Sequence, residues 1–192
     1  LLEAEVTDRS FAWTSQRLVE QFLESAYRFT EMKGKPPISK NSLTRIDLLV
    51  DRDDTEDVKE AIRLGKAVAT GVTAHKNIAN LPGNVCTPTF MANAAKDLAK
   101  SYKSVTTRVL SEAHMTKLGM GAFMAVSQGS EQPGKMIIMK HQGSSKADRP
   151  FVVVGKGITF DTGGISLKSN AGMADMIFDM CGAASVLGTM TT

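Results

Sequence analysis

The sequence has few of the residues that mark zinc clusters, disulfide frameworks or nucleic-acid-binding surfaces. Its 192 residues include two cysteines, Cys86 and Cys181, which form no zinc-like cluster, so a reducing cytosolic setting is the simpler interpretation. The net charge of +3 is too small to argue for a nucleic-acid partner. No signal peptide or membrane span is visible in the sequence. We therefore expect a cytoplasmic globular protein that binds neither membrane nor nucleic acid.

Apolar periodicity predicts an α/β protein. Hydrophobic residues make up 42% of the chain, enough for one core of moderate size. Helical spacing predicts helices over residues 11–31, 55–79 (with Thr55 as N-cap), 89–102, 112–118 and from about 171 to the end. Apolar and β-branched runs predict strands over residues 45–50, 105–110, 135–141 and 150–154. Strand–helix alternation of this kind favours a mixed, largely parallel sheet with helices on both faces.

A glycine-rich stretch after the last predicted strand carries the chemistry. Lys156, Asp161 and Lys168 lie there among several glycines, and Asp179 follows in a helix-like segment. Glycines gathered like this indicate close backbone approach, and buried lysines and carboxylates must pair or hold a metal. A carboxylate such as Asp161 can bridge two cations, whereas Lys156 could bind a metal only as the neutral amine. A charged Lys168 could stabilise a developing oxyanion.

Four stretches carry a family resemblance. They are Gly155–Lys168 (Gly-Lys-Gly-Ile-Thr-Phe-Asp-Thr-Gly-Gly-Ile-Ser-Leu-Lys), residues 179–184 (Asp-Met-Cys-Gly-Ala-Ala), residues 80–89 and residues 119–130. Together they resemble the leucyl (cytosol) aminopeptidases, which are two-metal exopeptidases. The resemblance covers roughly residues 60 to 192.

The resemblance implies a role for each site residue. Lys156, Asp161 and Asp179 would be metal ligands, with Asp161 shared between two divalent ions, zinc or manganese. Lys168 would be the catalytic electrophile, and Met173 would line the pocket for the substrate's first side chain. The substrates would be peptides with leucine-like N-terminal residues, and the assembly would be a homo-hexamer.

Two departures from the family pattern qualify this expectation. Ala174 stands where the family usually has an acidic residue, with Asp175 following. The family's Asn-Thr-Asp-Ala-Glu-Gly-Arg segment, with two more carboxylates and an arginine, does not occur in the sequence. We therefore expect residues 1–50 to be the tail of an N-terminal domain and linker. Residues 51–192 would be the first part of a catalytic domain whose sheet is incomplete C-terminally.

Other interpretations remain open beside the aminopeptidase. The chain could be a catalytically incomplete fragment that acts only in assembly or binding. The Asp161-Thr-Gly tripeptide also occurs in aspartic proteases, but those need two such carboxylates in a β-rich chain. A phosphate-binding loop would place the lysine after the glycines, the reverse of the order at Lys156. Structural ion pairs in a glycine-rich turn are the ordinary alternative, and His75 has no i+4 partner that would suggest a metal site.

Overall fold

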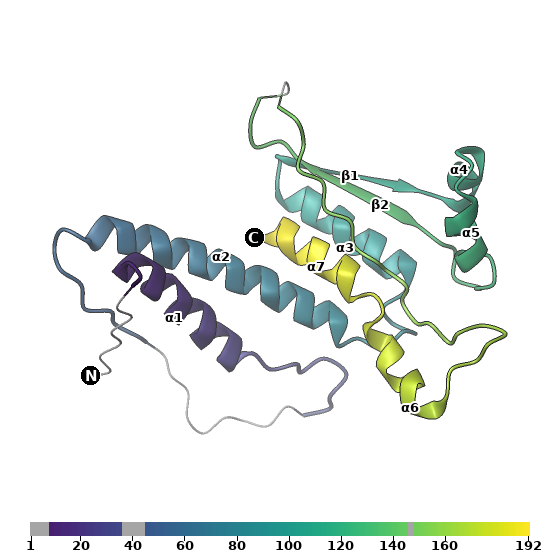
Figure 1. Cartoon of the computed structure of the whole chain (residues 1–192), viewed down its shortest axis with the longest axis horizontal. Helices are drawn as coiled ribbons and strands as arrows, with labels where there is room; N and C mark the ends of the chain where they lie inside the picture. The colour runs from purple at the N-terminus through teal and green to yellow at the C-terminus, as the bar shows by residue number, and fades with distance from the viewer. Residues whose placement is uncertain (1–7, 36–44, 146–147) are drawn as a thin grey trace.

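The computed structural model of the chain describes residues 8–35, 45–145 and 148–192. Its elements are, in order, α1 (Phe11–Ala26), α2 (Thr55–Ala79), α3 (Pro88–Ser101), β1 (Val105–Leu110), α4 (Glu112–Lys117), α5 (Gly121–Ser127), β2 (Met136–His141), α6 (Asn170–Met173), the 3₁₀ helix η1 (Ala174–Phe178) and α7 (Cys181–Thr191). In Figure 1, α1 lies along α2, and α3 and α7 lie between α2 and the strands. The predicted α/β class is confirmed.

Helix α1 is shorter than predicted. It begins after Ser10, whose hydroxyl accepts a hydrogen bond from the amide of Trp13 at 3.2 Å, and it ends at Ala26 instead of residue 31. Tyr27 leaves the helix with an extended backbone, and its hydroxyl accepts a hydrogen bond from Asn80 Nδ2 at 3.3 Å. The apolar spacing beyond residue 26 therefore reflects packing against the end of α2 and not a longer helix. Pro36 and Pro37 lie outside the described residues.

The predicted boundaries of α2 are confirmed, but its N-cap is not. Asp54 occupies that position and Thr55 is the first helical residue, with its hydroxyl donating to the carbonyl oxygen of Asp51 at 3.2 Å. Near the other end of α2, Lys76 forms a 2.8 Å ion pair with Glu24 of α1. This pair helps to hold the two long helices side by side.

The two strands pair in an antiparallel register, from Val105 opposite His141 to Leu110 opposite Met136. Helix α3 packs against this pair, and the hydroxyl of Thr107 in β1 donates to the carbonyl oxygen of Ala95 at 2.9 Å. Within the described residues these are the only paired strands. The predicted largely parallel sheet with helices on both faces is therefore not confirmed.

Two predicted strands are wrong. Residues 45–50 and 150–154 have no strand pairing in the described part of the chain. Phe151, Val152, Val153 and Val154 are 99%, 73%, 57% and 89% exposed, so this apolar run is not buried. A β-branched run has the propensity for a strand, but a strand forms only when a neighbour supplies hydrogen-bond partners.

The core lies where the end of α2, the loop after it, α3 and α7 meet. Its buried members are Leu81, Cys86, Met91, Ala95, Met180, Ala184 and Leu187. Ile137 and Met139 of β2 pack against this cluster from the sheet. The core therefore holds α7 in place directly behind the glycine-rich stretch.

The predicted helix from residue 171 onward is divided into α6, η1 and α7. By length and composition alone, Asn170–Thr191 is apolar enough to cross a membrane. However, Asp175 and Asp179 interrupt its apolar surface and α7 packs on α2, where a Cβ at Gly71 would lie 2.6 Å from the carbonyl oxygen of Gly188. We interpret the run as helices of a folded domain.

Candidate active site

Residues 155–157 pass across the first turn of α7 at backbone contact distance. The amide of Ala183 donates to the carbonyl oxygen of Lys156 at 2.7 Å. A Cβ at Gly155 would lie 2.3 Å from the carbonyl oxygen of Gly182, closer than side-chain carbons approach other atoms. This contact fixes the backbone of Lys156 beside the turn that carries Asp179.

Lys156 and Asp179 form an ion pair across 23 residues of sequence, with Nζ of the lysine against Oδ1 of the carboxylate. The Asp179 side chain is 16% exposed, whereas that of Lys156 is 57% exposed. The second oxygen, Asp179 Oδ2, is buried and has no hydrogen-bond partner. Buried carboxylate oxygens are normally satisfied, so this unpaired oxygen is an exception that calls for an explanation.

A tight loop returns Lys168 to Asp161. Gly163 has φ +88°, a left-handed conformation that favours glycine, and a Cβ there would lie 2.4 Å from the carbonyl oxygen of Ser166. The amide of Lys168 donates to the carbonyl oxygen of Thr162 at 3.0 Å, which closes the loop. As a result, Lys168 Nζ lies 2.8 Å from Asp161 Oδ2.

The environment of Asp161 favours its ionised form. The hydrogen bond from Lys168 lowers the pKa of Asp161 most, and the amide of Gly163, which donates to Asp161 Oδ1 at 2.8 Å, lowers it further. The charges of Lys168 and Lys156 act in the same direction. The charge of Lys156, which pairs with Asp179, is the smallest of these influences on the pKa of Asp161.

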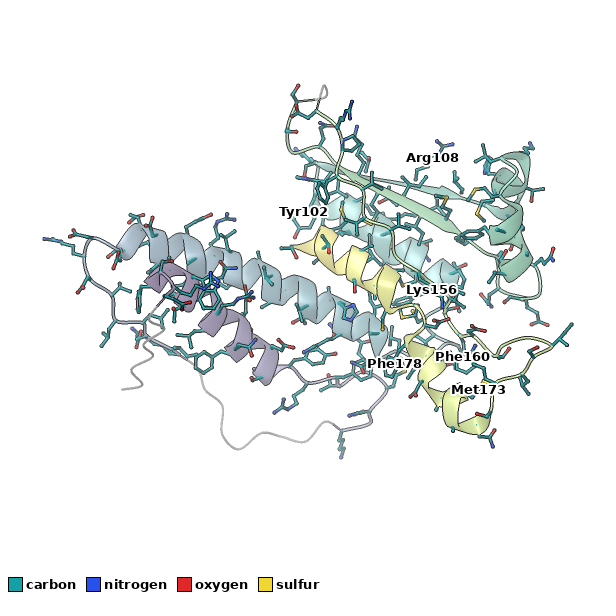
Figure 2. The ribbon with its side chains drawn as sticks, viewed as in Figure 1. Tyr102, Arg108, Lys156, Phe160, Met173 and Phe178 are labelled. Atoms are coloured by element: carbon teal, nitrogen blue, oxygen red, sulfur yellow. The ribbon has the colours of Figure 1, made fainter. Side chains whose placement is uncertain are left out.

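The structure brings four of the five predicted site residues into two ion pairs, Lys156 with Asp179 and Lys168 with Asp161. Met173 is half-buried at the end of α6 and belongs to neither pair. Figure 2 shows Met173 at α6, below Lys156, which lies beside α7. Among the described residues, no three His, Cys, Asp or Glu side chains are grouped closely enough to hold a metal. In the described part of the chain, the two ion pairs alone therefore do not make up a complete metal site.

Sequence reasoning missed two contacts that hold this site. Gly83, in the loop before α3, lies against residue 160: a Cβ at Gly83 would be 2.9 Å from the Cβ of Phe160. Gly182 lies against Lys156 in the same way, with a Cβ 2.7 Å from its backbone nitrogen. In both cases the only signal was a glycine inside a family-like motif, and the glycine's partner could not be read from the sequence.

Residues 73–192 match the family model described as the cytosol aminopeptidase family, catalytic domain. The match covers more than half of the chain. The chain belongs to the cytosol aminopeptidase family.

Relatives named "Probable cytosol aminopeptidase" match almost the whole chain. The relative from Paraburkholderia phymatum is 47% identical over 190 residues, and the relative from Thioalkalivibrio sulfidiphilus is 47% identical over 191 residues. Each alignment covers 99% of this chain but 38% of the relative. The chain thus spans well under half the length of these cytosol aminopeptidases. Their names place the family among the hydrolases.

Solved structures also match almost the whole chain and only part of their own length. The bottromycin maturation enzyme BotP in complex with Mn aligns with 98% of this chain at a TM-score of 0.77 and 26% sequence identity, covering 38% of that chain. A second BotP structure aligns at a TM-score of 0.74 and 27% identity. The fold of this cytosol aminopeptidase segment is therefore similar to part of an enzyme that is solved with manganese.

Proposed function

We propose that the protein carrying this sequence is a metal-dependent aminopeptidase that removes N-terminal residues from peptides, with leucine preferred. Family membership supports the reaction class. The observation that carries the proposal is the ion pair of Lys156 with Asp179, in which Asp179 Oδ2 is buried and free of hydrogen bonds. A buried oxygen without a partner is costly unless a cation uses it.

The residues present fit one side of a site for two divalent ions, zinc or manganese. Asp161 and Asp179 would supply oxygens, and Lys156 would supply nitrogen as the neutral amine. To do so, Lys156 would have to lose its proton and exchange its ion pair with Asp179 for the metal. A ligand set of one amine and carboxylates does not choose between the two metals. When bound, such ions lower the pKa of water and polarise a carbonyl group.

The remaining site residues act on the substrate side. Lys168 would keep its charge and donate to the oxygen on which negative charge develops, and its 2.8 Å ion pair with Asp161 would hold it in position. The left-handed turn at Gly163 sets the return path of the chain to Lys168. Met173, half-buried at the end of α6, would line the pocket for the first side chain of the peptide.

The other expectations belong to the same proposal. The protein would act in the cytoplasm as a homo-hexamer on peptide substrates, without a membrane or nucleic-acid partner. Relatives carry more than half of their length outside the part matched here. We propose that the further metal ligands lie in polypeptide that corresponds to that portion of the relatives.

A chimaera tests the proposal. Residues 1–192 would replace the matched part of the Paraburkholderia phymatum relative, and hydrolysis of leucyl-p-nitroanilide would be measured together with metal content. We expect the chimaera to be active. Asp161→Asn should abolish turnover and deplete metal, whereas Lys168→Ala should lower turnover with metal retained. Full activity and full metal content in the Asp161→Asn chimaera would refute the assignment.

The alternative is a catalytically incomplete fragment that acts only in assembly or binding. The exposed apolar run from Phe151 to Val154 favours it, because such a surface suits contact with another polypeptide. Under both hypotheses the isolated 192-residue chain should not cleave leucyl-p-nitroanilide. Turnover by the isolated chain at the rate of the chimaera would contradict the proposal that further ligands are needed.

A further inference from the structure

The backbone contact between residues 155–157 and the start of α7 sets the position of Lys156. Helix α7 has no side-chain N-cap hydrogen bond. One of its first amides, that of Ala183, is instead satisfied by the carbonyl oxygen of Lys156 at 2.7 Å. The first amides of a helix have no partner within it, so Lys156 contributes its carbonyl to cap α7 while its side chain reaches Asp179.

We propose that Gly155 and Gly182 are positioning residues for Lys156, keeping its backbone against α7 so that Nζ meets Asp179. The importance of this position for catalysis rests on the proposed function. Neither glycine has a positive φ, so conformational freedom is not what these positions require. What they require is room, because each lies against backbone and not against a side chain that could move aside.

The distances show how little room there is. A Cβ at Gly155 would lie 2.3 Å from the carbonyl oxygen of Gly182 and 2.7 Å from the Cα of Ala183. A Cβ at Gly182 would lie 2.7 Å from the backbone nitrogen of Lys156. Relieving such contacts to ordinary separation needs a shift of about 1 Å. The same shift would stretch the Ala183 hydrogen bond beyond the range of about 2.7–3.2 Å. A displacement of that size at a catalytic group can cost about 100-fold in rate.

Gly157 is a milder case at the same contact. A Cβ there would lie 3.0 Å from the Cβ of Ala183, which is a side chain and can be removed. Gly172, in α6, has open space around its Cα and provides a matched position near the site. The chain therefore offers a graded series of glycine-to-alanine changes.

Amide hydrogen exchange at Ala183 in the 192-residue chain tests the proposal without any metal. We expect Gly155→Ala and Gly182→Ala to speed exchange of the Ala183 amide at least 10-fold, with exchange in β1 and β2 unchanged. Gly172→Ala should leave Ala183 protected. Unchanged Ala183 exchange in a folded Gly155→Ala or Gly182→Ala variant would overturn the proposal.

A rescue pair decides the case if those two variants do not fold, as judged by far-ultraviolet circular dichroism. Gly157→Ala should partly speed hydrogen exchange of the Ala183 amide. Adding Ala183→Gly should restore the protection of the amide at residue 183. Loss of protection without restoration in the G157A/A183G double variant would also overturn the proposal, because the contact would then not be what fixes the backbone.

A double-mutant cycle connects the contact to Lys156. Manganese affinity would be measured by electron paramagnetic resonance in the chimaera described above, with Mn²⁺ alone as the probe. Gly182→Ala should weaken affinity at least 10-fold when Lys156 is present and should have no further effect in a Lys156→Met background. An equal loss in both backgrounds would show that Gly182 does not act through Lys156. If the chimaera binds no manganese, the proposed function fails, whereas the exchange result still decides the positioning role.

Discussion

At the scale of single residues, the site consists of two lysine–carboxylate pairs that differ in burial. Asp179 is mostly buried and keeps one oxygen without a partner, whereas Asp161 is accessible and uses both oxygens, one on Lys168 and one on the Gly163 amide. The unused oxygen of Asp179 could accept a cation directly, whereas Asp161 would have to exchange one of its present donors for a cation.

The electrostatics of Asp161 give a first prediction. Removing the hydrogen bond and charge of Lys168 by Lys168→Ala should raise the pKa of Asp161 toward its ordinary value of 3.8. Lys156→Ala should raise it less, because that lysine acts only through its charge and is the weakest cause. Carboxyl-carbon NMR titration of the 192-residue chain measures both changes, and Lys103→Ala, at an exposed position, serves as the control.

The sign of the accompanying stability change follows from linkage. The folded chain holds the pKa of Asp161 below its ordinary value, so the favourable contribution is fully present above about pH 4. It is lost as the pH falls through the lowered folded pKa. The fall in the free energy of unfolding on acidification should therefore be smaller in Lys168→Ala than in the unmodified chain. A pKa of Asp161 that does not move in this variant would contradict the 2.8 Å pairing.

The charged residues of the site could be predicted from the sequence, but their ion-pair partners could not. The sequence allowed the selection of Lys156, Asp161, Lys168 and Asp179, because buried lysines and carboxylates among glycines must pair or hold a metal. Their pairing could not be predicted, since Lys156 meets Asp179 where Gly155 contacts Gly182 across the fold, and Lys168 meets Asp161 through the turn at Gly163. Contacts between backbones distant in sequence leave no signal beyond the glycines themselves.

At the scale of elements, helix ends with a capping side chain are set by local chemistry. Thr87 precedes Pro88 and its hydroxyl accepts a hydrogen bond from the amide of Phe90 at 3.2 Å, which is the usual N-cap arrangement. Ser169 occupies the same position before α6 but forms no side-chain cap hydrogen bond. The two positions therefore form a matched pair for testing the cap.

We predict that Thr87→Ala lowers the free energy of unfolding by about 1 kcal/mol, because the amide of Phe90 loses its partner. Ser169→Ala should change it by less than about 0.5 kcal/mol. Urea unfolding of the 192-residue chain, followed by circular dichroism, measures both. Equal losses in the two variants would show that the cap hydrogen bond is not the source of the stabilisation.

The bounds of α2 and α3 were predicted well, whereas α5 (Gly121–Ser127) was not predicted and two of the four predicted strands were wrong. Helices α2 and α3 satisfy their own hydrogen bonds, so periodicity and caps along the sequence define them. The segments at residues 45–50 and 150–154 have strand-like composition but lack a paired neighbour. Strand propensity measures fit to a surface that other segments must provide.

At the scale of the whole molecule, the chain has a core that supports its site from one side. Helices α2, α3 and α7 bury the apolar cluster, and α7 carries residues 182–183 against Lys156. The apolar run at residues 151–154, just before the site, stays exposed. Within residues 151–157, the glycines therefore pack against α7, whereas the apolar side chains before them are exposed to solvent.

This exposed run gives the last prediction. Four consecutive large apolar residues without charge or proline form a surface that favours association. The 192-residue chain should therefore sediment with increasing mass as its concentration rises. Phe151→Lys should shift it toward the monomer, because the lysine adds charge to a residue that is 99% exposed. Leu118→Lys, at a residue that is 65% exposed and is flanked by Lys117 and Gly119, is the matched control and should leave association unchanged. An equal shift with both variants would show that net charge, and not the apolar run, governs association. A wild-type chain that stays monomeric at all concentrations would show that the run does not drive self-association.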